Sequence, residues 1–250
     1  MIPSLILSVR FLTIVPVPGR EAEGRGALGR AAWWFPVVGL GLGAALVVLD
    51  RVLALVFPPL LSALLVLSCW KVATGGIHLD GLADCLDGLG GRDQPDRLAI
   101  MRDSRIGTFG AIGLILDVLI ALLALAALLP GTRGRILLLA PVVGRLAPLL
   151  VGPRFRAATP GHGAGDSFQS AISDGAGLVH LIAAAALGAW LLGPWGPGMI
   201  VAALGAVFVW SAFLATRLGG LTGDALGSGV ELGELAILLA GASLAHRGII

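Results

Sequence analysis

The sequence is poor in charge, in cysteine and in the short motifs of soluble nucleotide-binding enzymes. Only 13% of its 250 residues are charged and 57% are hydrophobic, whereas a typical soluble domain has about 25% charged residues. Two cysteines, Cys69 and Cys85, are too few for a disulfide framework. The chain has no P-loop, dinucleotide fingerprint or zinc-ligand spacing, and no basic run that would bind nucleic acid. These absences indicate a single integral membrane domain that spans residues 1–250.

Long apolar runs, separated by helix breakers such as Pro58, Pro59 and Pro130, fill most of the chain. They predict an all-α fold, a polytopic membrane bundle of about seven transmembrane helices. The predicted spans are 31–57, 60–79, 107–130, 136–151, 177–193, 197–217 and 232–250. The first segment, 2–17, is shorter and contains Arg10, so we expect it to lie in the membrane interface or to re-enter. It has no charged n-region or small-residue cleavage site, which argues against a signal peptide.

Arginines are distributed unevenly between the two ends of the predicted spans. From a cytoplasmic N-terminus, the inward connections hold ten and the opposite face four. The ten are Arg20, Arg25, Arg30, Arg92, Arg97, Arg102, Arg105, Arg154, Arg156 and Arg217; the four are Arg51, Arg133, Arg135 and Arg247. By the positive-inside rule this predicts a multi-pass protein of the cell (inner) membrane. The same orientation puts both acidic segments, and hence the site, on the cytoplasmic face.

Three aspartates, Asp80, Asp84 and Asp87, follow the second apolar span in the run TGGIHLDGLADCLDGLGG, residues 74 to 91. Offsets of four and three place their carboxylates on one helical face. Two such charges 6 Å apart repel by roughly 3 kcal/mol at an effective dielectric near 20, so the pattern favours a bound cation. Oxygen-only ligands indicate Mg²⁺ or Mn²⁺ rather than zinc. The alternative is a solvated helix end with ordinary surface aspartates.

The segment MRDSRIGTFG, residues 101 to 110, concentrates Arg102, Ser104 and Arg105 before the third span. Guanidinium groups match phosphate geometry, and Ser104 or Thr108 is placed to cap the following helix and expose its N–H groups to an anion. We therefore predict phosphate contacts here. A basic loop that merely flanks the membrane is the alternative.

A second acidic segment, LTGDALGSGVELGELA, residues 221 to 236, precedes or enters the last span. Asp224 and Glu231 are seven residues apart and share a helical face, so both are candidate metal ligands. Glu234 is either a partner or an interfacial charge.

Other polar residues fall near or inside the spans. Lys71, Asp117 and Arg145 are expected at membrane depth, paired with each other or with the site. His78 is either a general base or an orienting group. His162 and Asp166 lie in a glycine-rich segment that is either a flexible connection or a loop closing over a ligand.

At these motifs the chain resembles the cobalamin synthase family. The resemblance rests on FLTIVPVP at 11–18, GGIHLDGLADCLDG at 75–88, MRDSRIGTFG at 101–110, GR at 144–145 and LTGDALGSGVELGE at 221–234. It implies a Mg²⁺-dependent membrane enzyme that joins adenosylcobinamide-GDP to α-ribazole, or to its 5′-phosphate, and releases GMP. The expected partners are these substrates and membrane lipid, with no nucleic acid, and self-association as a homo-oligomer is possible.

The resemblance also implies roles for individual residues. Asp80, Asp84, Asp87 and Asp224, with Glu231, would hold the metal, and Arg102, Ser104, Arg105 and Thr222 would bind substrate. A ribose hydroxyl would attack phosphorus, and its proton would go to a carboxylate, such as Asp84 or Asp87, or to His78. Arg102 stands where many relatives have lysine, and residues 154–168 follow the family pattern only loosely.

Two other classes share parts of the pattern. Residues 84–88, DCLDG, resemble the D-x-x-D-G core of CDP-alcohol phosphotransferases, although the rest of that signature is absent. A transporter would use the acidic helix as its binding site, but such sites lie at the bilayer midplane, often between inverted repeats. Both acidic segments here map to one surface, and no repeat is visible.

Overall fold

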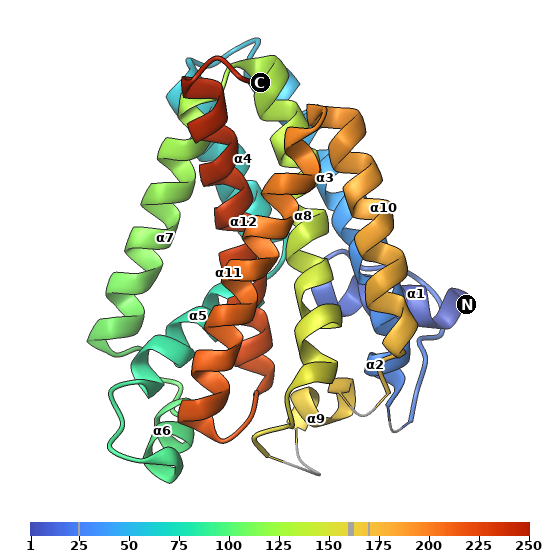
Figure 1. Ribbon diagram of the computed structural model, residues 1–250, viewed down its shortest axis with the longest axis vertical. Coiled ribbons are helices and arrows are strands. Elements are labelled where there is room, and N and C mark those ends of the chain that lie inside the picture. Colours follow the sequence, from blue (N-terminus) through green and yellow to red (C-terminus); the bar gives the residue numbers. More distant parts are fainter. Residues whose placement is uncertain (25, 160–162, 170) are drawn as a thin grey trace.

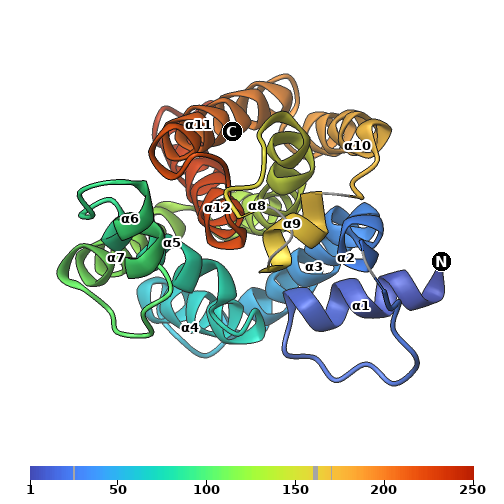
Figure 2. The ribbon, with the colours of Figure 1, turned by 90° about the horizontal axis from the view of Figure 1, so that it is seen from below.

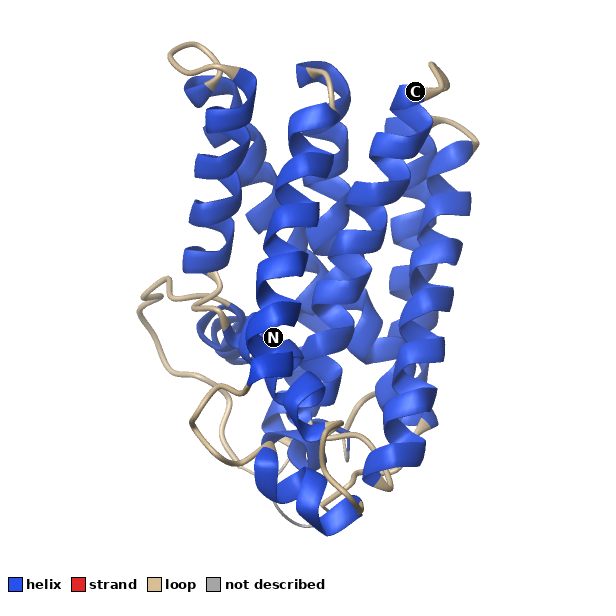
Figure 3. Cartoon of the chain, turned by 90° about the vertical axis from the view of Figure 1, so that its left-hand side faces the viewer, coloured by secondary structure: helices blue, strands red, loops and turns tan. Residues whose placement is uncertain are grey.

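The computed structural model describes residues 1–24, 26–159, 163–169 and 171–250, and helices account for nearly all regular structure in them (Figures 1 and 3). Arg25 and His162 lie outside the described residues. The helices are α1 (Ile2–Leu12), α2 (Ala27–Ala31), η1 (Ala32–Trp34), α3 (Phe35–Leu53), α4 (Pro59–Ala73), α5 (Ile77–Gly88), α6 (Gln94–Ile100), α7 (Thr108–Ala127), α8 (Pro130–Val151), η2 (Gly152–Arg154), α9 (Gly163–Gln169), α10 (Asp174–Leu192), α11 (Trp195–Leu218) and α12 (Gly223–His246).

Within the described residues, six helical segments are long and apolar enough to cross a membrane. A seventh crossing results if α4 and α5, which meet at a bend of 85°, form one broken span. This confirms the predicted polytopic bundle of about seven helices. Helix α1 is too short to cross and lies at the edge of the bundle, beside α2 and α3 (Figure 2).

Three predicted span boundaries are wrong. The predicted span 60–79 ends at Ala73, where the chain bends by 85° into α5, and buried charge pairing explains the other two. Helix α8 begins at Pro130 rather than at 136, because the Arg133 guanidinium is buried and lies 2.9 Å from the Asp50 carboxylate of α3. Arg133 is therefore a core residue rather than a loop charge of the opposite face. Helix α12 begins at Gly223 rather than at 232, so Asp224, Glu231 and Glu234 all belong to one helix.

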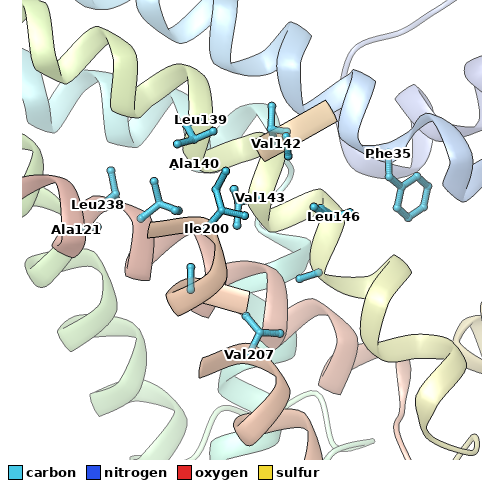
Figure 4. Packing of buried hydrophobic residues seen from close by; sticks show 14 of the residues in the cluster. Phe35, Ala121, Leu139, Ala140, Val142, Val143, Leu146, Ile200, Val207 and Leu238 are labelled. Carbon is cyan, nitrogen blue, oxygen red and sulfur yellow. The ribbon is translucent and has the colours of Figure 1, made fainter. Parts of the chain in front are cut away.

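Helix α8 is the centre of the bundle, and most of its side chains are buried. Leu139, Val143 and Leu146 of α8 pack toward Ile200 and Val207 of α11 (Figure 4). Glycines bring α3 close on another side: a Cβ added at Gly39 would lie 2.4 Å from the Pro141 carbonyl oxygen. Such close backbone approach is typical of helix packing in membranes, where van der Waals contact replaces the hydrophobic effect between helices.

The outer faces of the bundle are apolar, as a lipid-facing surface requires. Along α7, Ile112, Ile115, Leu119 and Leu123 recur at helical spacing and are exposed. The ends of the bundle differ in character. The end drawn lowest in Figure 1 carries α5, α6, α9 and the first turn of α12, and we call it the acidic end.

Candidate active site

The acidic helix α5 owes its direction to two glycines. Gly75 and Gly76 have φ values of 64° and 69°, a backbone region that residues with a Cβ rarely adopt. They end α4 and start α5 at 85° to it, so α5 runs obliquely across the acidic end instead of continuing along the bundle axis (Figure 1). The GG pair before the aspartates is thus the local reason that the three carboxylates lie at this end.

Helix α5 packs directly against the first turns of α12 (Figure 2). The two backbones are closest at Gly81, where an added Cβ would lie 2.8 Å from the carbonyl oxygen of Asp224. The glycine beside the aspartate thus admits a close neighbour, and that neighbour is a helix. This contact brings the second acidic segment to the first across more than 140 residues of sequence.

Asp80, Asp84 and Asp224 gather around this contact. Asp80 is exposed, while Asp84 and Asp224 are half-buried. Asp80, Asp224 and Asp87 all act on Asp84 as nearby negative charges that disfavour its ionised form. Among the described residues, no lysine or arginine forms an ion pair with Asp80, Asp84 or Asp224. The predicted gathering of these three carboxylates is therefore present, and the protein itself supplies them with no counter-charge.

The carboxylates are gathered without being arranged around one point. Within the part of the chain that the structure describes, no three His, Cys, Asp or Glu side chains form a ready-made metal site. The donor set is nevertheless suitable for a hard cation, because it consists only of oxygens, carries several like charges and remains accessible from the acidic end. Rotation of the side chains, or the oxygens of a substrate phosphate, would complete the coordination.

Asp87 has a different position from the other aspartates. Its carboxylate accepts hydrogen bonds from the backbone N–H groups of Gly107 at 2.7 Å and Gly110 at 2.8 Å, at the N-terminus of α7. The expectation that Ser104 or Thr108 would cap this helix is wrong, because neither side chain caps it. An anion does bind the free N–H groups, as predicted, but that anion is Asp87. Both of its oxygens are engaged in this way, and a metal role for Asp87 stays a prediction.

The basic segment 101–107 lies at the acidic end between α6 and α7. Arg102, Ser104 and Arg105 are exposed. The Arg105 guanidinium bonds to the Asp103 carboxylate, with the shortest contact at 2.5 Å, and this hydrogen bonding lowers the pKa of Asp103 to about 2. The hydrogen bond from Gly107 to Asp87 joins the segment to α5, and the side chains of Arg102 and Arg105 remain in solvent.

Thr222 and Glu231 have structural partners that the sequence did not reveal. The Thr222 hydroxyl oxygen caps α12 by accepting from the N–H of Ala225 at 3.0 Å, so a substrate contact there stays a prediction. Glu231 is buried and forms an ion pair with Lys71 of α4. It lies two turns deeper than Asp224, and the structure does not bring it to the other carboxylates.

Glu231 belongs to a buried charge network. Lys71 also contacts Glu234 at 3.2 Å, and Glu234 pairs with Arg145 of α8. Lys71 and Arg145 were predicted to pair with each other or with the site. Lys71 pairs with Glu231, one of the predicted site residues, and Arg145 pairs with Glu234, so both partners come from α12. Asp117 of α7 is buried near this network, which acts on it electrostatically. We call Lys71, Arg145, Glu231 and Glu234 the buried network.

His78 is 5% exposed and lies between the carboxylates and the buried network. It lines a cavity of about 140 Å³ together with Asp224 and Arg145. The other walls come from α1, α3 and α9, including Phe11, Phe35 and Phe168. No sequence signal separated these apolar residues from the rest of the core.

The segment around Asp166, read from the sequence as a flexible connection or a closing loop, contains α9. Gly165 of α9 approaches the backbone of Gly223, where an added Cβ would lie 2.7 Å from the Gly223 nitrogen. This contact places α9 over the first turn of α12, so part of the segment forms a wall of the site.

Comparison with known proteins shows which family the chain resembles. A sequence model of the family described as cobalamin-5-phosphate synthase matches residues 4–242. A protein of Chlorobium phaeobacteroides named adenosylcobinamide-GDP ribazoletransferase is 37% identical, with 96% of this chain and 98% of that protein covered. One of the same name from Thiobacillus denitrificans is 40% identical, covering 98% of each chain. A third, from Geotalea daltonii, is 37% identical over 96% of each. No solved structure matches.

Proposed function

The chain belongs to the cobalamin-5-phosphate synthase family, and we propose that it joins adenosylcobinamide-GDP to α-ribazole, or to its 5′-phosphate, with release of GMP. The relatives that carry this activity in their name match nearly the whole chain, so the proposal concerns the complete domain. One observation of the structure carries it: Asp80, Asp84 and Asp224 meet at the Gly81 contact without a cationic partner. Such a cluster suits the handling of a diphosphate.

The reaction is a phosphoryl-type transfer with one bond made and one broken. A ribose hydroxyl of α-ribazole attacks the phosphorus attached to the cobinamide arm, and the bond from that phosphorus to the oxygen of the guanylate breaks. GMP leaves with the bridging oxygen. The hydroxyl proton goes to a carboxylate of the cluster or to His78, both of which border the same cavity end.

We propose Mg²⁺, with Mn²⁺ as a substitute, as the cofactor of this site. Asp80, Asp84 and Asp224 would hold it, with Asp87 able to contribute a lone pair that its hydrogen bonds leave free. A bound divalent cation neutralises the diphosphate and stabilises the departing GMP. Glu231 is left out of this set, because its carboxylate is paired with Lys71 in the buried network.

Arg102 and Arg105 are placed to bind the remaining phosphate charge. Both are exposed at the acidic end, and their segment is fixed to α5 by the hydrogen bonds to Asp87. Guanidinium forks bind phosphate oxygens in pairs. The Asp103 partner of Arg105 would be exchanged for substrate on binding, since the pair is solvent-exposed and such pairs are weak. Ser104 adds a hydroxyl donor on the same loop.

We propose that the acidic end faces the cytoplasm and that the protein lies in the cell (inner) membrane. The elements at this end carry most of the arginines, including those of α6, the 101–107 segment, η2 and the end of α11. A nucleotide-linked substrate and a soluble nucleoside reach the site most directly from that compartment. Cleavage by trypsin after Arg102 or Arg105 from one side of sealed vesicles would test the orientation.

The proposal is tested by transfer from adenosylcobinamide-GDP to α-ribazole by the purified protein in lipid, with a CDP-activated lipid as the rival donor. EDTA should abolish turnover, and Mg²⁺ or Mn²⁺ should restore it. Asp84→Asn should lower kcat by roughly 10³-fold, the scale of losing electrostatic stabilisation of the transition state. Asp96→Asn, an exposed residue of α6, is the matched control and should retain activity. Transfer by Asp84→Asn at more than a tenth of the wild-type rate, or turnover only with the CDP-activated lipid, would overturn the proposal.

A further inference from the structure

The cavity beside the carboxylates has apolar walls and one polar end. Phe11, Phe35 and Phe168 stack in a row from three separate helices, with ring centroids 5.8 Å and 5.6 Å apart. These rings and neighbouring aliphatic side chains make the walls. His78, Arg145 and Asp224 form the polar end. Aromatic rings in this spacing favour a further flat ring that packs against them.

Size limits what the cavity can hold. Its volume is about 140 Å³, close to the roughly 150 Å³ apolar cavity that accommodates benzene in an engineered protein. A small aromatic ring system fits this scale. A corrin macrocycle is several times larger and must bind elsewhere, so the cavity is not the corrinoid site.

The polar end offers hydrogen-bond donors that the protein leaves unused. Nδ1 of His78 and Nε and Nη2 of Arg145 are buried and have no hydrogen-bond partner among the described residues. His78 is 5% and Arg145 1% exposed, so water does not satisfy them from bulk. Unpartnered polar atoms at this depth are uncommon and indicate a group that arrives with a ligand.

The pattern of donors distinguishes between the two aromatic bases of the proposed reaction. Guanine carries donors and acceptors along two edges, and most of them would be left unpaired against phenylalanine walls. The benzimidazole of a ribazole nucleoside has a single acceptor nitrogen once the other bears the ribose. One donor at the polar end of the cavity satisfies this nitrogen, and the ribose oxygens of the nucleoside can accept from the other donors there.

We propose that this cavity binds the benzimidazole base of the α-ribazole nucleophile, with its free ring nitrogen accepting a hydrogen bond from His78 or Arg145. The inference rests on the proposed function and names the place of one of its substrates. Asp224 lines the same cavity and packs on α5 at Gly81. A base held there would project its ribose hydroxyl toward the aspartates, so the cavity positions the nucleophile.

Filling the cavity tests this assignment. A Cβ at Gly227 of α12 has room, since its nearest neighbour would be 3.7 Å away on His78, and leucine there would extend into the cavity while raising helix propensity. Gly227→Leu should raise the KM for α-ribazole by roughly tenfold or more and leave the KM for adenosylcobinamide-GDP nearly unchanged. Gly227→Ala should give a smaller rise in the same direction. Gly41→Leu, whose Cβ would meet open space on α3, is the matched control.

An unchanged KM for α-ribazole in both Gly227 variants would overturn the proposal. A rise in the KM for adenosylcobinamide-GDP instead would also overturn it, because the cavity would then belong to the other substrate.

Direct binding separates failure of the cavity assignment from failure of the proposed function. In equilibrium dialysis, radiolabelled 5,6-dimethylbenzimidazole should bind the wild-type protein and the Gly41→Leu control, and should bind Gly227→Leu at least several-fold more weakly. This result needs no turnover, so it stands even if the wild type fails to use adenosylcobinamide-GDP. Equal binding by all three proteins would exclude a selective benzimidazole site. The site would also be excluded if guanosine or a saturated fatty acid displaced the radiolabelled benzimidazole at the same concentrations as α-ribazole does.

Discussion

Helix α12 carries two groups of carboxylates whose surroundings are opposite. Asp224, in its first turn, lies with Asp80 and Asp84 and has no cationic partner among the described residues. Glu231 and Glu234, two turns further into the bundle, are buried and paired with Lys71 and Arg145. The deeper group is neutralised by the chain itself, whereas the outer group has no counter-charge from the described residues.

The difference shows how acidic residues near a membrane divide into structural and reactive ones. A carboxylate without water must be paired within the protein, because an isolated buried charge costs several kcal/mol. A carboxylate at the acidic end can remain unpaired while water screens it, and it is then free for a metal ion or a proton. Distance from water, rather than residue type, separates the two groups.

Removing the cation of the buried network should give the largest loss of stability. Lys71→Met leaves Glu231 buried without its partner and should lower the free energy of unfolding by about 3–5 kcal/mol. Thermal unfolding of the purified protein in detergent would measure this. The double variant Lys71→Met with Glu231→Met removes both charges and should recover most of the loss. Equal stability of the single and double variants would mean that the ion pair does not hold the two helices together.

Widening the α5–α12 contact should disable the carboxylate cluster without removing any charge. In Gly81→Ala the new Cβ meets the backbone of Asp224 at 2.8 Å, and overpacking of this kind costs about 1–3 kcal/mol. We expect weaker activation by Mg²⁺, measured as a higher metal concentration at half-maximal turnover. Gly41→Ala serves as the control because its Cβ meets open space. Normal metal dependence in Gly81→Ala would show that the contact does not set the cluster.

Asp87 and Asp84 should respond differently to replacement by alanine, because Asp87 accepts hydrogen bonds at the start of α7 and Asp84 does not. Asp87→Ala removes the acceptor of two N–H groups at the start of α7 and should destabilise the protein by about 1–2 kcal/mol. Asp84→Ala should leave stability nearly unchanged and should abolish turnover. Parallel unfolding curves and kcat values for the two variants would measure this. A stability equal to wild type in Asp87→Ala would contradict the capping role.

The exposed ion pair between Arg105 and Asp103 should matter least for stability. Arg105→Gln removes the hydrogen bonds that lower the Asp103 pKa, so this pKa should return toward its ordinary value of 3.8. A lowered carboxyl pKa stabilises the fold above the unfolded-state pKa, and this contribution is lost as pH falls toward about 2. At pH 7 stability should stay unchanged while the KM for adenosylcobinamide-GDP rises. NMR titration of Asp103, together with unfolding measured at pH 7 and near pH 2, would test this prediction. A large loss of stability at pH 7 would contradict it.

The sequence predicted the parts of the site that depend on charge and periodicity. Asp80, Asp84 and Asp224 were identified because ionisable residues are conspicuous in an apolar chain. The turn at Gly75 and Gly76 was not predicted, because the expected span 60–79 runs through it. The helical membrane fold followed from the same apolar runs. These features are local, so the sequence alone is sufficient to find them.

The role of a residue could not be predicted from the sequence where it depends on a partner far along the chain. Glu231 resembles Asp224 in sequence, and only the position of Lys71, 160 residues away, makes it a structural residue. Asp87 has the spacing of a metal ligand, but the glycines at 107 and 110 occupy it. The starts of α8 and α12 were misplaced for the same reason, because buried partners allow charged residues inside a span.

The bonds from Gly107 and Gly110 to Asp87 have a mechanical consequence. They tie the lipid-facing helix α7 to the acidic helix, so a change in the tilt of α7 is transmitted to the aspartates. Helices adjust their tilt to the thickness of the surrounding bilayer. We therefore expect turnover in reconstituted vesicles to depend on the acyl-chain length of the lipid.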